Sequence, residues 1–326
     1  MMLGQNSYIK KLGPGIITAA LVFGPGSLTI NTKLGASFGF SLLWVLVLAM
    51  VFMSVFTRMS AKVGLASKVS FIKRIKQELG KPLAILVGIG VFLTTASFQA
   101  GNSIGASVAF AELFSTSYVL WLALFTALAI GLLFFESFYK ILEKVMIGLV
   151  VLMLASFLLT IIMAAPDITL IFKGLVPNIP TGSEYLVITL TASSFSIVGA
   201  FYQSYLVNEK GWKSEEASDC MKESQMGIII LGLLSTMVMI CAASVLHQKD
   251  IDVKNASDLG MALEPLFGSF TSKVFMVGFF AASFSSMVGN ATIGGVILAD
   301  TFFSESKLSH IKVRTMIMLV VTIGAI

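Results

Sequence analysis

Apolar runs alternate with short polar connections along the whole chain. Most of these runs reach the roughly 20 residues that an α-helix needs to cross the hydrocarbon core of a bilayer. The pattern therefore predicts an all-α, polytopic membrane protein in which each run forms one span. We place about nine spans, at 14–36, 41–62, 83–108, 118–136, 141–164, 185–207, 226–246, 273–299 and 312–326.

The last run stops at Ile326 after about 15 residues, which is short for a spanning helix. We therefore expect further spans beyond the printed C-terminus. The two longest connections, 165–184 and 247–267, are too short to hold a soluble domain. Residues 1–326 are thus predicted to form a single transmembrane domain.

The composition fits this class, since 56% of the residues are hydrophobic and only 12% are charged. Soluble domains carry about 25% charged residues. The net charge of +5 does not indicate nucleic-acid binding, because in a membrane protein the placement of the basic residues is what matters. No cofactor is predicted, and the two cysteines, Cys220 and Cys241, have no metal-ligand spacing.

The basic residues gather in alternate connections, which indicates how the chain crosses the membrane. Such residues concentrate on the cytoplasmic side, so the N-terminus is predicted to lie in the cytoplasm and the protein in the plasma membrane. The basic connections carry Lys10, Lys11, Lys62, Lys68, Lys73, Arg74, Lys76, Lys81, Lys140, Lys144, Lys210, Lys213, Lys222, Lys307, Lys312 and Arg314.

The first span is interrupted near its centre by the stretch 22-VFGPGSLTIN-31. Pro25 removes a backbone donor, and the glycines on either side tolerate an unwound chain. Unpaired backbone at membrane depth survives only where it is buried in protein or lines a cavity, and secondary transporters place such breaks at the substrate. The alternative is a simple proline kink. We predict substrate contacts at Gly24, Pro25, Gly26 and Ser27.

A transporter built from inverted repeats carries a second break in the equivalent helix. With repeats at about 14–164 and 185–326, that helix is the sixth span, 189-TLTASSFSIVGAFYQSYLV-207. Its centre is polar and rich in small residues, which also suits close packing between helices. We predict further substrate contacts at Ser193, Ser196 and Gly199.

The third span contains a polar cluster, 94-TTASFQAGNSIGAS-107. Gln99 and Asn102 are three positions apart and share a helical face. Because an unpartnered amide at membrane depth is costly, the pair either bonds to a neighbouring helix or lines the pathway. Asn31 and Lys33 are further pathway candidates, although Lys33 is better suited to reach the outer headgroups.

Few titratable groups remain inside the spans for a proton relay. Those left over lie near helix ends and are interpreted as solvated or interfacial charges. His247, at the outer end of the seventh span, and His310, in a cytoplasmic connection, do not sit at the midplane. The acidic residues in question are Glu112, Glu136, Glu143 and Asp300.

Several segments together resemble the Nramp family of proton-coupled divalent-metal transporters, which have the LeuT-type fold. The stretch 24-GPGS-27 aligns with the Asp-Pro-Gly-Asn motif of the family. The resemblance implies alternating access, in which a bundle with the broken helices 1 and 6 rocks against a scaffold that contains helix 3. Family members have eleven or twelve spans. Further similar segments are 38-FGFSLLWVLVLAM-50, 174-GLVPNIP-180, 204-SYLV-207, 211-GW-212 and 283-SFSSMVGNATIGGVILAD-300.

The chain departs from the family at the residues that carry the chemistry. The metal-binding Asp and Asn fall on Gly24 and Ser27. In the sixth helix, the sulfur ligand falls on Ser196, and the Ala whose carbonyl binds metal falls on Ser193. The His tied to proton movement falls on Val198, and the two acids of the proton route fall on Gln99 and Asn102.

These replacements leave the substrate open. Mn²⁺ and Fe²⁺ favour an anionic or imidazole ligand, and a dehydrated divalent ion among neutral groups carries a large desolvation cost. The possibilities are divalent metal transport as in the family, Mg²⁺ that keeps most of its water, or a small neutral or organic solute, with or without coupling to protons. A non-transporting sensor on the same fold is a further alternative.

An enzyme is not predicted, because the spans hold no nucleophile–base pair and no His/Asp metal cluster. The expected partners are the lipid bilayer and the transported solute or cation, with no nucleic acid. The sequence does not specify an oligomeric state, and a monomer is compatible with it.

Overall fold

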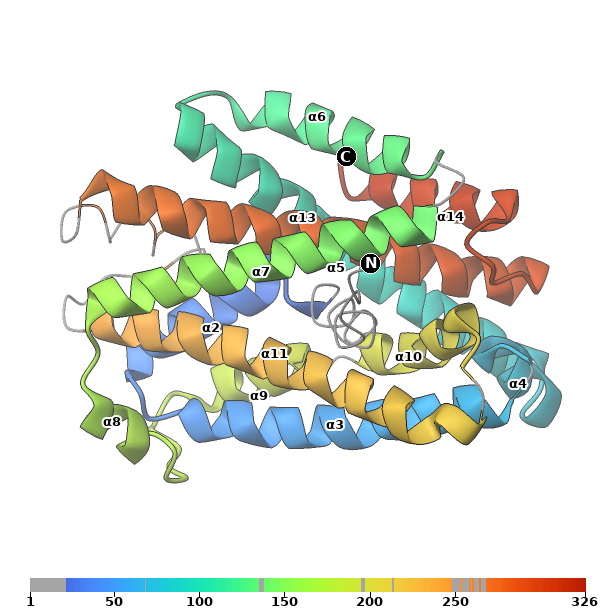
Figure 1. Ribbon diagram of the computed structural model, residues 1–326, viewed down its shortest axis with the longest axis horizontal. Coiled ribbons are helices and arrows are strands. Elements are labelled where there is room, and N and C mark those ends of the chain that lie inside the picture. The colour runs from blue at the N-terminus through green and yellow to red at the C-terminus, as the bar shows by residue number, and fades with distance from the viewer. Residues whose placement is uncertain are drawn as a thin grey trace, which may run out of the picture.

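Figure 1 shows a computed structural model in which long helices run side by side along one axis of the molecule. The structure describes residues 22–67, 69–134, 138–194, 197–212, 214–247 and 268–326, together with the single positions 253, 258, 260 and 264. Every regular element in these ranges is helical, so the prediction of an all-α protein is confirmed. The helices are α2 Pro25–Phe38, α3 Leu43–Ala66, α4 Phe71–Glu78, α5 Lys81–Phe114, α6 Tyr118–Leu132, α7 Phe138–Ala164, α8 Ile168–Lys173, α9 Glu184–Ser194, α10 Ile197–Lys210, α11 Ala217–Val245, α13 Ser269–Phe303 and α14 Ile311–Ile323.

Five helices are long and apolar enough to cross a membrane: α3, α5, α11, α13 and the part of α7 from Ile147 to Ala164. The polytopic membrane architecture is therefore confirmed, whereas the number of nine spans stays a prediction. The first predicted span begins before the described residues, and α6 and α14 have only 15 and 13 residues.

Two short helices lie in connections where the hydrophobic pattern predicted none. They lie at opposite ends of the molecule, with α4 at one end and α8 at the other (Figure 1). The side chain of Asp167 caps α8 by accepting a 2.8 Å hydrogen bond from the Thr169 N–H. On α4, Ile72 is buried, whereas Lys73, Arg74 and Glu78 are exposed.

The helix α13 forms the centre of one half of the structure, where it packs against α5, α7 and α14. Small residues allow the close approach. A Cβ at Gly295 would lie 2.5 Å from the Ile317 backbone of α14. In the other half, α2 packs against α11, where Gly35 fits against the backbone at Met239.

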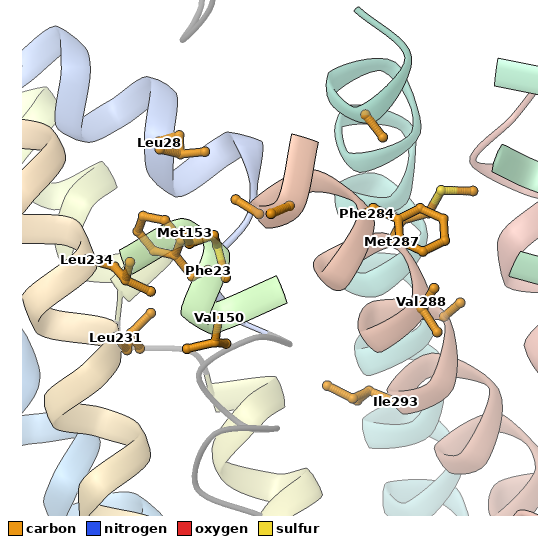
Figure 2. Close-up of a cluster of buried hydrophobic side chains, with 14 of the residues drawn as sticks. Phe23, Leu28, Val150, Met153, Leu231, Leu234, Phe284, Met287, Val288 and Ile293 are labelled. Atoms are coloured by element: carbon orange, nitrogen blue, oxygen red, sulfur yellow. The ribbon is translucent and has the colours of Figure 1, made fainter. Parts of the chain in front are cut away.

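Buried apolar side chains fix the position of α2 at its start. Figure 2 shows Phe23 among Met153, Leu231 and Leu234, which project from α7 and α11. The Phe23 side chain is fully buried, and its ring meets that of Phe157 edge to face at a centroid distance of 6.2 Å. A large side chain just before α2 therefore anchors the break between α7 and α11.

The interpretation of Asp300 as a solvated charge is wrong. Only 2% of this residue is exposed, and the Tyr205 hydroxyl donates a 2.7 Å hydrogen bond to its carboxylate. The Ile72 N–H donates in turn to the Tyr205 oxygen at 3.2 Å. These two hydrogen bonds join α13, α10 and α4. The Tyr205 hydroxyl supplies a partner to a buried carboxylate, which would be costly without one.

Of the other acidic residues considered for a proton relay, only Glu112 has a side chain within the described part of the structure. Glu112 is exposed, as the sequence predicts. Glu136 and the side chain of Glu143 lie outside the described residues.

Candidate functional site

The first span is broken where the sequence predicts it. Val22 is helical, Phe23 and Gly24 are not, and α2 begins at Pro25. Gly24 is extended, with φ −126° and ψ −174°, and Pro25 occupies the first helical position, where its missing N–H costs nothing. The first intrahelical bond is Leu28 N–H to Gly24 C=O. The N–H groups of Gly26 and Ser27 consequently have no intrahelical acceptor.

A small cavity of about 30 Å³ lies at this break. Four helices or their ends converge on it: the break before α2, α5, the start of α10 and the middle of α13. A buried water needs about 10–15 Å³, so the cavity has room for a small ion or two to three waters. It is lined by Val22, Gly24, Gly26, Ser27, Phe98, Asn102, Val198 and Asn290.

Four residues predicted from the sequence line this cavity: Gly24, Gly26, Ser27 and Asn102. Pro25 points away from it, toward Gly105 on α5. The roles of Gly24, Pro25, Gly26 and Ser27 as substrate contacts, and of Asn102 as a pathway residue, stay predictions. The structure brings the four lining residues together from two segments that lie more than seventy positions apart in the chain.

The narrowest approach is at Gly24. A Cβ at this position would lie 2.8 Å from the Asn102 Oδ1 atom and 2.8 Å from the Ser286 Oγ atom. The glycine is therefore required for the close approach of the chain to α5 and α13, in addition to the unwound backbone.

Asn102 is the polar side chain best placed to act on a substrate. It is 3% exposed, lines the cavity, and its Nδ2 atom has no hydrogen-bond partner in the described part of the chain. A buried amide without a partner is costly, so the position favours a ligand or an ordered water in the cavity.

Only some of the residues predicted in the sixth span belong to the described part of the structure. The helix α9 ends at Ser194 and α10 begins at Ile197; Ser196 and the side chain of Ser193 lie outside the described residues. Val198 lines the cavity, and its neighbour Gly199 is buried. The second break and the roles of Ser193, Ser196 and Gly199 stay predictions.

The remaining pathway candidates do not line the cavity. Gln99 is fully buried and packs against Gly324, after α14, so the amide pair on α5 faces two different neighbours. Asn31 is also fully buried. Among the described residues, neither amide has a hydrogen-bond partner at either of its polar atoms. Lys33 is partly exposed on α2.

Four cavity residues were not predicted as site residues from the sequence: Val22, Phe98, Val198 and Asn290. Asn290 lies within the apolar eighth predicted span, and Phe98 lies beside Gln99 on α5. Asn290 could have been noticed as an amide inside an apolar run, which is the same signal that identified Asn102. Phe98 carries no such signal, because an aromatic residue in a span ordinarily faces lipid or core.

The described residues that line the cavity are all neutral. Its polar groups are the amides of Asn102 and Asn290, the hydroxyl of Ser27 and backbone groups. No carboxylate, imidazole or thiolate is among its lining residues, and the described parts of the chain hold no group of three His, Cys, Asp or Glu that could bind a metal. Such a site can exchange hydrogen bonds with a hydrated ion or a neutral solute, but supplies no formal negative charge.

Comparisons with known proteins agree with this architecture. A family model for Nramp, described as "Natural resistance-associated macrophage protein-like", matches residues 15–326. The divalent metal cation transporter MntH of Yersinia pestis (strain Pestoides F) is 26% identical over 297 residues, covering 89% of this chain and 72% of the relative. MntH of Erwinia tasmaniensis is 27% identical over 314 residues, covering 94% and 76%.

Two solved structures share the fold. A mutant of the Eremococcus coleocola manganese transporter superposes with a TM-score of 0.77 at 19% identity, covering 100% of this chain and 72% of the other. Mhp1, a nucleobase-cation-symport-1 family transporter in a closed conformation, gives a TM-score of 0.71 at 12% identity, covering 97% and 70%. The expected LeuT-type fold is confirmed by these matches.

Proposed function

Because this chain belongs to the Nramp family of integral membrane transporters, we propose that it moves a small substrate by alternating access and binds it in the cavity at the α2 break. The observation that carries this proposal is the position of the cavity. It lies where an unwound segment in the first span faces α5, α10 and α13. Breaks of this kind hold the substrate in secondary transporters.

For the substrate, we propose a hard divalent cation that keeps most of its water, with Mg²⁺ as the first candidate. The curated relatives are divalent metal cation transporters. None of the described residues that line the cavity is anionic, and Mg²⁺ dehydrates reluctantly and retains several waters. Those waters can donate hydrogen bonds to the side-chain oxygens of Ser27, Asn102 and Asn290.

A neutral solute is the second candidate, and one observation favours it. The N–H groups of Gly26 and Ser27 point from the start of α2 without an intrahelical acceptor. They suit a hydroxyl or carbonyl oxygen better than a cation. The small volume of the cavity opposes this candidate, because sites for organic ligands usually measure about 300–1,000 Å³.

The basic residues support an orientation with the α4 end in the cytoplasm. Lys73, Arg74 and Lys76 lie on or beside α4, and Lys307 follows α13 at the same end (Figure 1). Because such residues favour the cytoplasmic side, we assign the α8 end to the outside of the plasma membrane.

Uptake into sealed proteoliposomes tests the function directly. We expect Mg²⁺ to enter faster than Mn²⁺, because Mn²⁺ gains less from a site without charged ligands. We expect no accompanying proton current. The measurement is the accumulation of each ion against protein-free liposomes, with a neutral polyol in a parallel series.

Three other outcomes of the uptake experiment would decide against Mg²⁺ as the substrate. Uptake of Mn²⁺ with a proton current contradicts the hydrated-cation account. Uptake of the polyol alone establishes the second candidate. Binding without any uptake favours a non-transporting sensor and rejects alternating access.

An acid introduced at Asn102 should convert the cavity toward transition metals. For Asn102→Asp we expect Mn²⁺ to bind at least about tenfold tighter, because a carboxylate beside Gly24 supplies the missing anionic ligand. Isothermal titration of the purified protein with Mn²⁺ and Mg²⁺ provides the measurement.

The matched control is Gln99→Glu, which places the same charge on α5 outside the cavity lining. Equal gains from both variants, with both eluting as folded protein, would show that charge on α5 acts at long range and not as a cavity ligand.

A further inference from the structure

A second and larger cavity, of about 330 Å³, opens at the α8 end of the molecule. We call it the α8 cavity. It is bounded by the turn that follows α2, by α8 with its following turn, and by the end of α11. Its apolar walls include Phe38, Leu170 and Val176. The volume falls within the range of sites for small organic molecules, about ten times that of the cavity at the α2 break.

The polar groups of the α8 cavity come from a few residues. Lys173, in the last turn of α8, supplies a positive charge. No carboxylate occurs among the residues that line this cavity, and Lys173 has no ion-pair partner within the described ranges. An ammonium group at the edge of an apolar pocket selects an anion with an apolar body.

The orientation of His247 is fixed by α2. Its Nδ1 atom lies 2.8 Å from the Ala36 carbonyl oxygen, and since a carbonyl can only accept, Nδ1 carries the proton. The other edge of the ring lies beside Gly39, where a Cβ would be 3.2 Å from Nε2. In the neutral imidazole, Nε2 is therefore an acceptor at the cavity.

We propose that the α8 cavity binds a small hydroxycarboxylate with an apolar body. The Lys173 ammonium pairs with the carboxylate, the His247 Nε2 atom accepts a hydrogen bond from the hydroxyl, and the apolar body packs between Phe38 and Leu170. This site lies apart from the cavity at the α2 break and shares no lining residue with it.

The ligand would also affect transport, because α2 joins the two cavities. The helix begins at the α2 break and ends at Phe38, and the next residue, Gly39, turns the chain with φ +60° in the wall of the α8 cavity. A ligand that braces this turn restrains the half-helix at one end. The effect of the ligand on transport rests on the proposed function, whereas binding of the ligand in the α8 cavity does not.

Trp44 provides a reporter for binding. Its Nε1–H donates a 2.9 Å hydrogen bond to the carbonyl of Asn178, which lines the α8 cavity. The chain has three tryptophans, so replacing Trp121 and Trp212 by Phe leaves Trp44 alone. Fluorescence of this variant is titrated with mandelate, with phenylacetate, which lacks the hydroxyl, and with mandelamide, which lacks the charge.

We expect mandelate to bind most tightly. Phenylacetate should bind about fivefold more weakly, as expected for one lost hydrogen bond. Mandelamide should bind roughly tenfold more weakly, because the charge-assisted bond is lost. Lys173→Gln should bring the affinity for mandelate down to that for mandelamide.

The control variant is Lys273→Gln, which removes the same charge from an exposed site near the start of α13 at the same end. It should bind mandelate as the parent does. Equal affinities for the three compounds, or unchanged mandelate binding in Lys173→Gln, would overturn the site. If the ligand restrains α2, mandelate should also slow Mg²⁺ uptake into proteoliposomes. Binding in the expected order without this slower uptake would keep the site and reject only its effect on α2.

Discussion

Gly24→Ala is expected to reduce uptake to the level of protein-free liposomes while the protein remains folded. A Cβ at this position would lie 2.8 Å from both Asn102 Oδ1 and Ser286 Oγ, closer than real Cβ contacts allow. The methyl group must either displace the Asn102 side chain or fill part of a cavity of about 30 Å³. The first outcome removes a polar partner from the substrate, and the second removes space. The affected atoms belong to side chains, so the helices need not separate.

Gly90→Ala is the matched control for this effect. It adds the same methyl group on α5 outside the cavity lining, where no atom beyond the local helix lies within 4 Å. We expect uptake within about twofold of the parent, because alanine is favoured over glycine in a helix interior. The comparison requires both variants at equal reconstituted amounts, judged by size-exclusion chromatography. Equal uptake by the two variants would show that the substrate does not pass Gly24.

Gly35→Ala is expected to produce the largest loss of folded protein. A Cβ here would run into the Met239 carbonyl oxygen and lie 2.8 Å from the Ala243 nitrogen, both in the α11 backbone. Overpacking of this kind costs about 1–3 kcal/mol, and backbone has less freedom to move aside than a side chain. The variant should therefore melt at a lower temperature and give less monodisperse protein.

Gly101→Ala separates this steric effect from the removal of a glycine as such. No atom outside the local helix lies within 4 Å of a Cβ at Gly101 on α5, and alanine in a helix interior is favoured over glycine by about 1 kcal/mol. Its melting temperature should equal or exceed that of the parent. If Gly35→Ala melts at the same temperature as Gly101→Ala, the close packing of α2 on α11 does not hold in the membrane.

The break in the first span could be predicted from sequence because its cause is local. Pro25 and the flanking glycines remove a donor and permit an extended chain at the same place, whatever the rest of the fold does. The long apolar runs are predictable for a similar reason, since the bilayer fixes their length. The LeuT-type fold was predicted from the resemblance of short motifs to the family and not from hydrophobic periodicity.

Contacts between distant segments could not be predicted in this way. Asp300 lies near a helix end, which ordinarily indicates solvent, and its burial depends on Tyr205 from another helix. Gln99 and Asn102 share a helical face in sequence, yet a difference of three positions turns one toward Gly324 and the other toward Gly24. The short helix α4 has an apolar face formed by Phe71, Ile72 and Ile75, but its eight residues are far shorter than the apolar run that predicts a membrane span.

The hydrogen bonds around Asp300 bear on how the two faces of the molecule operate. The helix α10 is bonded to α13 and α4 through the Tyr205 hydroxyl, whereas α2 is bonded to His247 at the opposite end. The two sets of hydrogen bonds involve different helices and different ends of the molecule. Under the alternating access proposed above, one set can break while the other stays intact, so the two ends need not open together.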